Sequence, residues 1–526
     1  MATQELAHGD SAGTILGHPK GLFVLFFAEM WERFSYYGMR ALLIFYLTKH
    51  WLFSDSQAGV IYGAYTALVY ITPVLGGYLA DKYLGQRKAV TYGAVLLTFG
   101  HFLMGFEGSG GQDPAALNIF WLALAFIIVG SGFLKANISV IVGQLYPRTD
   151  VRRDGAYTIF YMGINLGAFL GSLLCGYLGE TYGWAYGFGA AGVGMLLGLL
   201  VFVGFKPLLL GRGEPPRALA KGLEWGLYAV GIAAVGACWW MVQNQAIVGT
   251  LLGLAGAILV AYVLFTAVVK LPPHDRDRIF AAMFLILGSI LFWALFEQAG
   301  SSLNLYTDRH VDRNIFGFEV PASVFQSVNA AYIVLLAPVF AALWTWLGRK
   351  GLEPSAPAKF GLALMQLGLG FLVLVAGAAT GNLTPVLFIF LIYLFHTTGE
   401  LCLSPVGLSA MNRLAPAHMA SLIMGTWFFA SATGNFAAGL IAAATGSEAA
   451  SGEGAGKQVV LDVYSQIGWI AIAVGVGVLV ISPLIRKLMH LDTLRDDNVS
   501  DALEGQESLG VEPQQAGIHP ATRPAE

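Results

Sequence analysis

The stretch "AEMWERFSYYGMR", residues 28–40, lies between two apolar runs, "GLFVLFF" at 21–27 and "ALLIFYL" at 41–47. Together they form one hydrophobic segment that is long enough to cross a bilayer, which requires about 20 apolar residues. The middle of this segment nevertheless carries four ionisable side chains, Glu29, Glu32, Arg33 and Arg40. A charge at the centre of a lone membrane helix costs about 3 kcal/mol on insertion scales. These groups must therefore face a protein interior or a wet cavity.

The whole chain has the composition of a polytopic membrane protein. Of its 526 residues, 56% are hydrophobic and only 12% are charged, about half the charged share of an ordinary soluble domain. The net charge of −3 gives no reason to expect a nucleic-acid partner. Cys175, Cys238 and Cys402 each lie in an apolar run without metal-like spacing, so we expect buried small hydrophobes, no metal site and no cofactor.

Charged, proline-rich and glycine-rich breaks divide the chain into fourteen apolar segments. The first six are 21–48, 57–80, 89–106, 117–143, 156–178 and 184–205, followed by a pair at 222–241 and 246–269. The last six are 279–303, 322–347, 359–378, 384–411, 419–445 and 461–485. Residues 1–20 show no signal-peptide pattern, so the first segment is expected to stay in the membrane as an uncleaved helix.

This pattern predicts an all-α polytopic membrane protein with fourteen transmembrane helices. Two six-helix bundles, at 21–206 and 278–488, are expected to be separated by an inserted helix pair with linkers at 207–277. The segment 1–20 and a disordered polar tail at 489–526 complete the chain. Two similar halves are typical of transporters whose bundles rock around a site at the bilayer midplane. We expect the inserted pair to be peripheral, because it carries no charge between Trp225 and Val269.

The distribution of Lys and Arg predicts the orientation. With both termini in the cytoplasm, the inside loops hold twenty of these residues and the outside loops hold four. Cytoplasmic loops of membrane proteins carry such an excess of positive charge. Both termini are therefore expected inside, which also supports an even number of helices.

The ionisable groups of the first segment fall on one helix face. At about 100° per residue they occupy, together with Tyr36 and Tyr37, an arc of roughly 140°. One interpretation is a structural ion-pair network. The other, which we favour because the group is larger than structural pairing requires, is a pathway for a substrate or an ion.

Other segments add buried polar groups, each of which taken alone is also compatible with a satisfied core residue. They are Lys135, Asn165, Glu297, Asn329 and Glu400. The first half of the chain thus supplies the cations Arg33, Arg40 and Lys135, and the second half supplies the carboxylates Glu297 and Glu400. A cavity between the halves would carry a charge gradient that suits a zwitterion. Aromatic residues in the same segments are candidates for pocket walls: Tyr36, Tyr37, Tyr70, Trp293 and Trp427.

A second motif, "GGYLADKYLGQRK" at 76–88, lies at the cytoplasmic end of the second segment. The excess of Lys and Arg that is usual in cytoplasmic loops is one sufficient explanation of its basic residues. The more specific hypothesis is a helix-end latch in which Asp81 pairs with a basic group across the short loop.

The motifs together resemble the proton-coupled oligopeptide transporters, a branch of the major facilitator superfamily. "EMWERFSYYGMR" is similar to the family's Glu-x-x-Glu-Arg-Phe-x-Tyr-Tyr-Gly signature, and "GGYLADKYLGQRKAVTYGA" and "YTIFYMGINLGAF" resemble two further signatures. The resemblance covers roughly residues 20–485, and it implies the major facilitator fold. The extra helix pair is typical of bacterial members.

The resemblance implies uptake of di- and tripeptides driven by inward proton movement. Proton coupling falls to Glu29, Glu32, Glu297 and Arg40, with Glu297 expected to pair with Arg40 and close the outer gate. The peptide carboxylate is expected at Arg33 and Lys135, and the amine at Asn165, Asn329 and Glu400. The remaining pocket positions are Tyr36, Tyr37, Tyr70, Trp293, Ser404 and Trp427. The implied setting is the bacterial cytoplasmic (inner) membrane, with lipids around a functional monomer.

Two departures and several alternatives stay open. Phe296 stands where many members carry a second glutamate, and no histidine occurs in the second segment, so coupling is expected to rest on carboxylates alone. The same fold carrying nitrate, an amino acid or a peptide-like drug is one alternative, and a peptide sensor that does not transport is another. An intramembrane enzyme is not expected, because His396 and Glu400 have no third ligand beside them.

Overall fold

The computed structural model describes residues 13–146, 150, 152–379, 382–446 and 453–491. Within these residues the chain forms fourteen long α-helices, as predicted, and the all-α membrane fold class is confirmed. Twelve of the helices are long and apolar enough to cross a membrane. The other two are α2 (Lys20–Phe45), which holds the four ionisable residues quoted above, and α4 (Gln86–Met104), which includes Arg87, Lys88 and His101.

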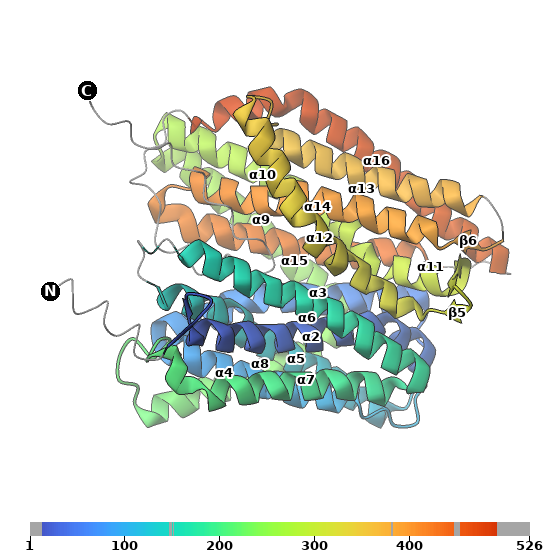
Figure 1. The fold of residues 1–526 in the computed structure, drawn as a ribbon, viewed down its shortest axis with the longest axis horizontal. Coiled ribbons are helices and arrows are strands. Elements are labelled where there is room, and N and C mark those ends of the chain that lie inside the picture. Colours follow the sequence, from blue (N-terminus) through green and yellow to red (C-terminus); the bar gives the residue numbers. More distant parts are fainter. Residues whose placement is uncertain (1–12, 147–149, 151, 380–381, 447–452, 492–526) are drawn as a thin grey trace.

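The helices form two bundles and an inserted pair (Figure 1). The N-terminal bundle comprises α2 and α4 with α3 (Asp55–Leu79), α5 (Pro114–Gln144), α6 (Arg153–Tyr182) and α7 (Trp184–Gly204). The insertion consists of α8 (Lys221–Gln243) and α9 (Gln245–Lys270). The C-terminal bundle comprises α10 (Pro273–Phe296), α12 (Ser327–Arg349), α13 (Ala356–Ala378), α14 (Leu387–Leu414), α15 (Ala420–Ala444) and α16 (Glu453–Leu488).

Both described chain ends lie on one side of the molecule, called here the near end (left in Figure 1). The short strands β1 (Thr14–Ile15) and β2 (His18–Pro19) pair antiparallel there. The opposite, far end carries the π-helical turn η1 (Tyr46–His50), the short helix α11 (Ser302–His310) and the antiparallel hairpin β4 (Asn314–Ile315) and β5 (Phe318–Glu319). Strands β3 (Val311–Asp312) and β6 (Thr384–Pro385) pair in parallel. Further short turns are η2 (Ala80–Leu84), η3 (Lys206–Leu209), η5 (Ala322–Gln326) and η6 (Ala417–Met419).

The first helix of the C-terminal bundle differs from its prediction. The segment 279–303 was expected to be one helix, but α10 ends at Phe296, and a 3₁₀ turn, η4 (Glu297–Gly300), precedes α11. The backbone at Ser301 leaves the helical region, with φ −124° and ψ −98°. Apolar periodicity does not register such a break, because the side chains on both sides of it remain buried. Glu297 therefore lies at a helix end rather than inside a helix.

The predicted latch at Asp81 is wrong. Its carboxylate accepts a hydrogen bond of 2.7 Å from the Gln86 amide instead of pairing with a basic group across the loop. The nearby cations turn the other way, because Arg87 pairs with Glu214 and Lys88 pairs with Glu224, each at 2.7 Å. Glu214 lies in the linker before α8 and Glu224 lies in α8 itself. Both are far from residues 76–88 in the sequence, so the motif alone does not reveal them.

The insertion is attached to the N-terminal bundle through hydrogen bonds. Besides the two ion pairs of α4, Tyr92 donates to the Tyr228 carbonyl at 2.7 Å, and Trp239 donates to Asn118 at 2.9 Å. Many of the large side chains of α8 and α9 are exposed, which is consistent with a peripheral pair. Cys175, Cys238 and Cys402 are buried, as predicted.

Glycine allows the closest helix contacts in the N-terminal bundle. In α6, a Cβ atom at Gly167 would collide with the Met30 carbonyl oxygen of α2, and one at Gly171 would collide with the Phe34 carbonyl oxygen. Small residues at such positions let two membrane helices approach backbone to backbone. This contact fixes α2, and with it the polar face, against α6.

Gly167→Ala is expected to lower the stability of the purified protein by about 1–3 kcal/mol, the usual cost of overpacking. Gly189→Ala is the matched control, because a Cβ atom at Gly189 in α7 meets nothing within 4 Å. Unfolding titrations in one detergent measure both variants. Equal stability of the two would contradict the proposed close contact between α2 and α6.

Candidate functional site

The polar face of α2 is fully enclosed. Glu29 and Glu32 are both 0% exposed, Arg33 is 3% exposed and Arg40 is 6% exposed. The Arg33 Nε donates to Glu29 Oε1 at 2.7 Å and lies 3.3 Å from Glu32 Oε2. One guanidinium thus compensates two buried carboxylates of the same helix, Glu29 one turn earlier and Glu32 directly before it in the chain.

Lys135 of α5 completes this buried cluster from a second helix. It is 5% exposed, and its Nζ lies 3.6 Å from the centre of the Tyr36 ring and 5.9 Å from that of Tyr70. A desolvated ammonium on an aromatic face gains about 2 kcal/mol. The sequence analysis expects both tyrosines in a pocket wall, whereas in the structure Tyr36 lies directly against the lysine and Tyr70 lies farther from it.

Arg40 connects the N-terminal bundle with the C-terminal bundle. Its Nη2 pairs with Glu297 Oε2 at the end of α10, so the contact expected between these two residues is present. Its Nε donates to the Tyr62 hydroxyl of α3 at 2.6 Å. Gly300 leaves the space for this hydroxyl, because a Cβ atom there would collide with it. The break after α10 therefore supplies both the carboxylate and the space that the arginine needs.

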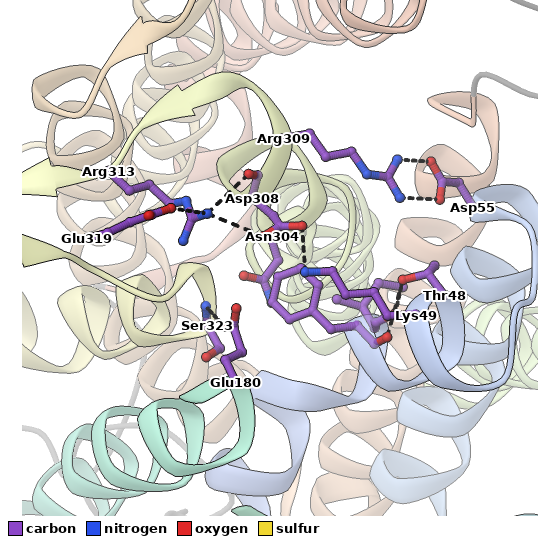
Figure 2. A network of polar contacts seen from close by, with 12 residues as sticks. Thr48, Lys49, Asp55, Glu180, Asn304, Asp308, Arg309, Arg313, Glu319 and Ser323 are labelled. Atoms are coloured by element: carbon purple, nitrogen blue, oxygen red, sulfur yellow. Dashed lines mark hydrogen bonds and ion pairs between the residues drawn. The ribbon is translucent and has the colours of Figure 1, made fainter. Parts of the chain in front are cut away.

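A second set of ion pairs joins the bundles at the far end (Figure 2). Arg309 of α11 makes two hydrogen bonds to Asp55 of α3, at 2.5 and 2.9 Å. Lys49 of η1 pairs with Asp308 at 2.7 Å. Figure 2 also shows the Ser323 backbone N–H donating to Glu180 of α6, at 2.7 Å. These contacts hold the two bundles together at the far end.

The opposite wall of the site belongs to the C-terminal bundle. Asn329 of α12 donates from Nδ2 to Glu400 Oε2 at 3.1 Å and to Thr397 Oγ1 at 3.0 Å, both on α14. Trp427 of α15 is 1% exposed and packs beside Gly407, where a Cβ atom would collide with its ring. Glu400 is thus held in place by an amide.

A cavity of about 100 Å³ lies between the two bundles. It brings nine of the predicted residues together: Tyr37, Arg40, Tyr70, Asn165, Trp293, Glu297, Asn329, Glu400 and Trp427. Pockets for small ligands usually enclose roughly 300–1,000 Å³. The cavity is therefore too small for a peptide, and a ligand larger than a few waters requires the wall to move.

The other predicted residues do not line the cavity. Glu29, Glu32, Arg33, Tyr36, Lys135 and Ser404 are buried beside it, each at most 5% exposed. Two buried hydroxyl groups of this set, those of Tyr36 and Ser404, have no hydrogen-bond partner in the described part of the chain. The side chains of this set reach a ligand only if the cavity extends towards them.

Sequence reasoning missed several wall residues. They are Tyr161, Gln326, Tyr393, His396, Ser431 and Asn435. Tyr393 and His396 precede Glu400 by seven and four residues, so helical spacing from Glu400 was a signal that would have found them. Among the described residues, no group of three or more His, Cys, Asp or Glu is arranged to bind a metal.

The comparisons with known proteins agree with this geometry. A model of the POT family matches residues 87–460. The chain is 38% identical to "Peptide transporter YePEPT" of Yersinia enterocolitica, over 81% of this chain and 88% of that protein. It is 32% identical to "Dipeptide and tripeptide permease B" of Salmonella typhimurium, over 90% of this chain and 97% of that protein. A crystal structure of a peptide transporter POT in complex with alafosfalin matches with a TM-score of 0.80 at 36% identity, covering 93% of this chain and all of that one.

The ion pair between Arg40 and Glu297 predicts that substitutions of the two residues have non-additive effects on the free energy of unfolding. Arg40→Ala and Glu297→Gln should each cost about 3–5 kcal/mol, because each leaves a buried charge without its partner. The double variant should lose clearly less than the sum, since two residues in contact are not independent. Unfolding titrations of the four proteins in one detergent measure this.

As a control, a second double-mutant cycle combines Arg40→Ala with Glu353→Gln. Glu353 pairs with Lys359 and shares no partner with Arg40. This cycle should be additive within about 0.5 kcal/mol. Additivity of both cycles would show that the pair carries no coupling energy.

Proposed function

The chain belongs to the POT family and is a peptide transporter, and from this premise we propose that it is a proton-coupled symporter that imports di- and tripeptides by alternating access. The observation that carries the proposal is the cavity between the bundles, where Arg40 meets Glu297 while Glu400 stands on the opposite wall. A site with cationic and anionic walls favours a zwitterion over a simple anion such as nitrate.

We assign the substrate roles from the charges that line the cavity and those buried beside it. The peptide carboxylate is bound by Arg33 and Lys135, since charge-assisted hydrogen bonds are about twice as strong as neutral ones. The ammonium is bound by Glu400 with Asn165 and Asn329. The wall for the side chains consists of Tyr36, Tyr37, Tyr70, Trp293, Ser404 and Trp427. The enclosed volume of about 100 Å³ means that binding requires the bundles to separate first.

Proton coupling follows from the ion pairs. A proton on Glu297 removes its attraction for Arg40, and the far end loosens. The bound peptide then bridges the two bundles, which favours closure at the far end and opening at the near end. Glu29 and Glu32 exchange protons while Arg33 and Lys135 alternate between carboxylate and substrate. The chain acts as a monomer without enzymatic activity.

The orientation belongs to the same proposal. With the near end in the cytoplasm of a bacterium and the far end outside, the ion pairs of Arg40, Lys49 and Arg309 close the outer entrance. This direction agrees with the excess of Lys and Arg in the near-end loops. The protein is then an inner-membrane importer with both termini in the cytoplasm.

The role of Glu32 is tested by comparing proton-driven uptake of peptide with peptide counterflow. Glu32→Gln should abolish uphill uptake of a labelled dipeptide into proteoliposomes with an inward proton gradient, because Glu29 loses the carboxylate with which it exchanges protons. Counterflow of peptide should persist, since exchange needs no net proton movement. Glu353→Gln, which changes a carboxylate at the near end, should keep both activities. Uphill uptake by the Glu32 variant would exclude an essential role.

The orientation of the peptide is tested with blocked analogues. Glu400→Gln should weaken binding of a free dipeptide and largely remove discrimination against an N-acetylated one, which has no ammonium. Lys135→Ala should instead narrow the difference between a free dipeptide and its C-terminal amide. Competition against a labelled dipeptide, with nitrate as a further competitor, measures all four compounds at one pH. The reverse pattern in the two variants would mean that the peptide lies the other way round, and strong competition by nitrate would contradict the peptide proposal.

A further inference from the structure

A groove between α4 and α8 lies away from the transport cavity. It encloses about 620 Å³ and opens at the surface of the bundle. On the α4 side it is lined by Arg87, Lys88, Thr91, Tyr92 and Val95, and on the α8 side by Trp225, Tyr228, Ala229 and Ile232. Polar contacts join α4 to the insertion along this groove, two ion pairs at the near end and the hydrogen bond from Tyr92 to Tyr228 deeper in.

The polarity of the groove changes along its length. Its two cations lie in the first turn of α4 at the near end, whereas Val95 and Ile232, about 48% and 51% exposed, lie deeper. Trp225 is 72% exposed beside the charged end. A charged end followed by an apolar trough has the same order as the headgroup and acyl chains of a lipid in one leaflet.

A third cation lies on the same side of α8. At about 100° per residue, Lys221 and the four lining residues of α8 fall within an arc of roughly 100°. Lys221 is the first residue of the helix and is exposed, and it forms no ion pair with any residue that the structure describes. Its ammonium is therefore available to an anion on the side of α8 that faces the groove.

The net charge at the near end of the groove is positive, because the cations there outnumber the carboxylates. Glu214 and Glu224 pair with Arg87 and Lys88, and Lys206 lies 3.7 Å from Glu214. The hydrogen bond from Arg87 keeps the pKa of the Glu214 carboxyl below its ordinary value, so this carboxylate stays charged. Arg87 donates only Nε and Nη2 to it, which leaves further N–H groups for another anion.

We propose that this groove is a binding site for one anionic phospholipid, with the phosphate at Lys221, Lys88 and Arg87 and an acyl chain along Tyr92, Val95 and Ile232. Basic pockets between transmembrane helices bind anionic headgroups in this way. The occupied groove fills the space between the insertion and α4. The site is independent of the transported substrate.

The test is lipid retention. The full-length purified protein is stripped with detergent, mixed with equal amounts of phosphatidylglycerol, phosphatidylethanolamine and phosphatidylcholine, and examined by native mass spectrometry. Phosphatidylglycerol should be retained about fivefold more than either zwitterionic lipid, the effect of roughly one basic residue near a headgroup. Equal retention of the three lipids overturns the proposal.

Two matched pairs of variants locate the site. Ala229→Trp fills the groove and should reduce phosphatidylglycerol retention about fivefold, whereas Val230→Trp, which is exposed, lies about 100° farther around α8 and does not line the groove, should keep it. Lys221→Gln should remove most of the preference for the anionic lipid, whereas Lys270→Gln, at the exposed end of α9, should not. If both Ala229→Trp and Lys221→Gln retain phosphatidylglycerol as the parent protein does, the proposed site is wrong. If the Ala229→Trp protein does not fold, the comparison of Lys221→Gln with Lys270→Gln decides.

Discussion

One ion pair, between Arg40 of α2 and Glu297 at the end of α10, connects the two bundles beside the cavity. Both side chains are buried, at 6% and 4% exposed, so neither charge is stable there without the other. Removing one partner of a buried pair typically costs about 3–5 kcal/mol. The contact therefore ties the arrangement of the bundles beside the cavity to the charge state of a single carboxylate.

A local break in helix geometry after α10 places the two residues of this pair in contact. A straight helix over 279–303 would have kept Glu297 in a regular turn, but the 3₁₀ turn and the bend at Ser301 place it at a helix end opposite Arg40. Gly300 in the same turn admits the Tyr62 hydroxyl, which accepts a second hydrogen bond from the arginine. Farther out, Asp55 and Arg309 repeat the same kind of connection between α3 and α11.

The sequence predicted the fold well, because apolar length identifies most membrane helices, twelve of the fourteen that the structure describes. It also predicted nine residues that share the cavity, since an ionisable, amide or aromatic side chain in an apolar segment is conspicuous. It did not predict the break after Phe296, the space at Gly300 or the pairing of Arg87 and Lys88 with the insertion. Each of these depends on residues far apart in the chain, and hydropathy contains no information about such contacts. Asp81 was assigned a basic partner from its neighbours alone, and the correct partner, Gln86, is neutral.

The central claim is that protonation of Glu297 releases the far end. The most direct measurement is the distance between spin labels on Ala115→Cys and Leu383→Cys, two exposed positions at the far end of the two bundles, in lipid nanodiscs across a pH series. The three native cysteines are buried, so the labels report these two sites. The distance between the labels should lengthen as the pH falls, and it should be long at every pH when Glu297→Gln is added. A distance distribution that is short and unchanged by pH and by Glu297→Gln would contradict it.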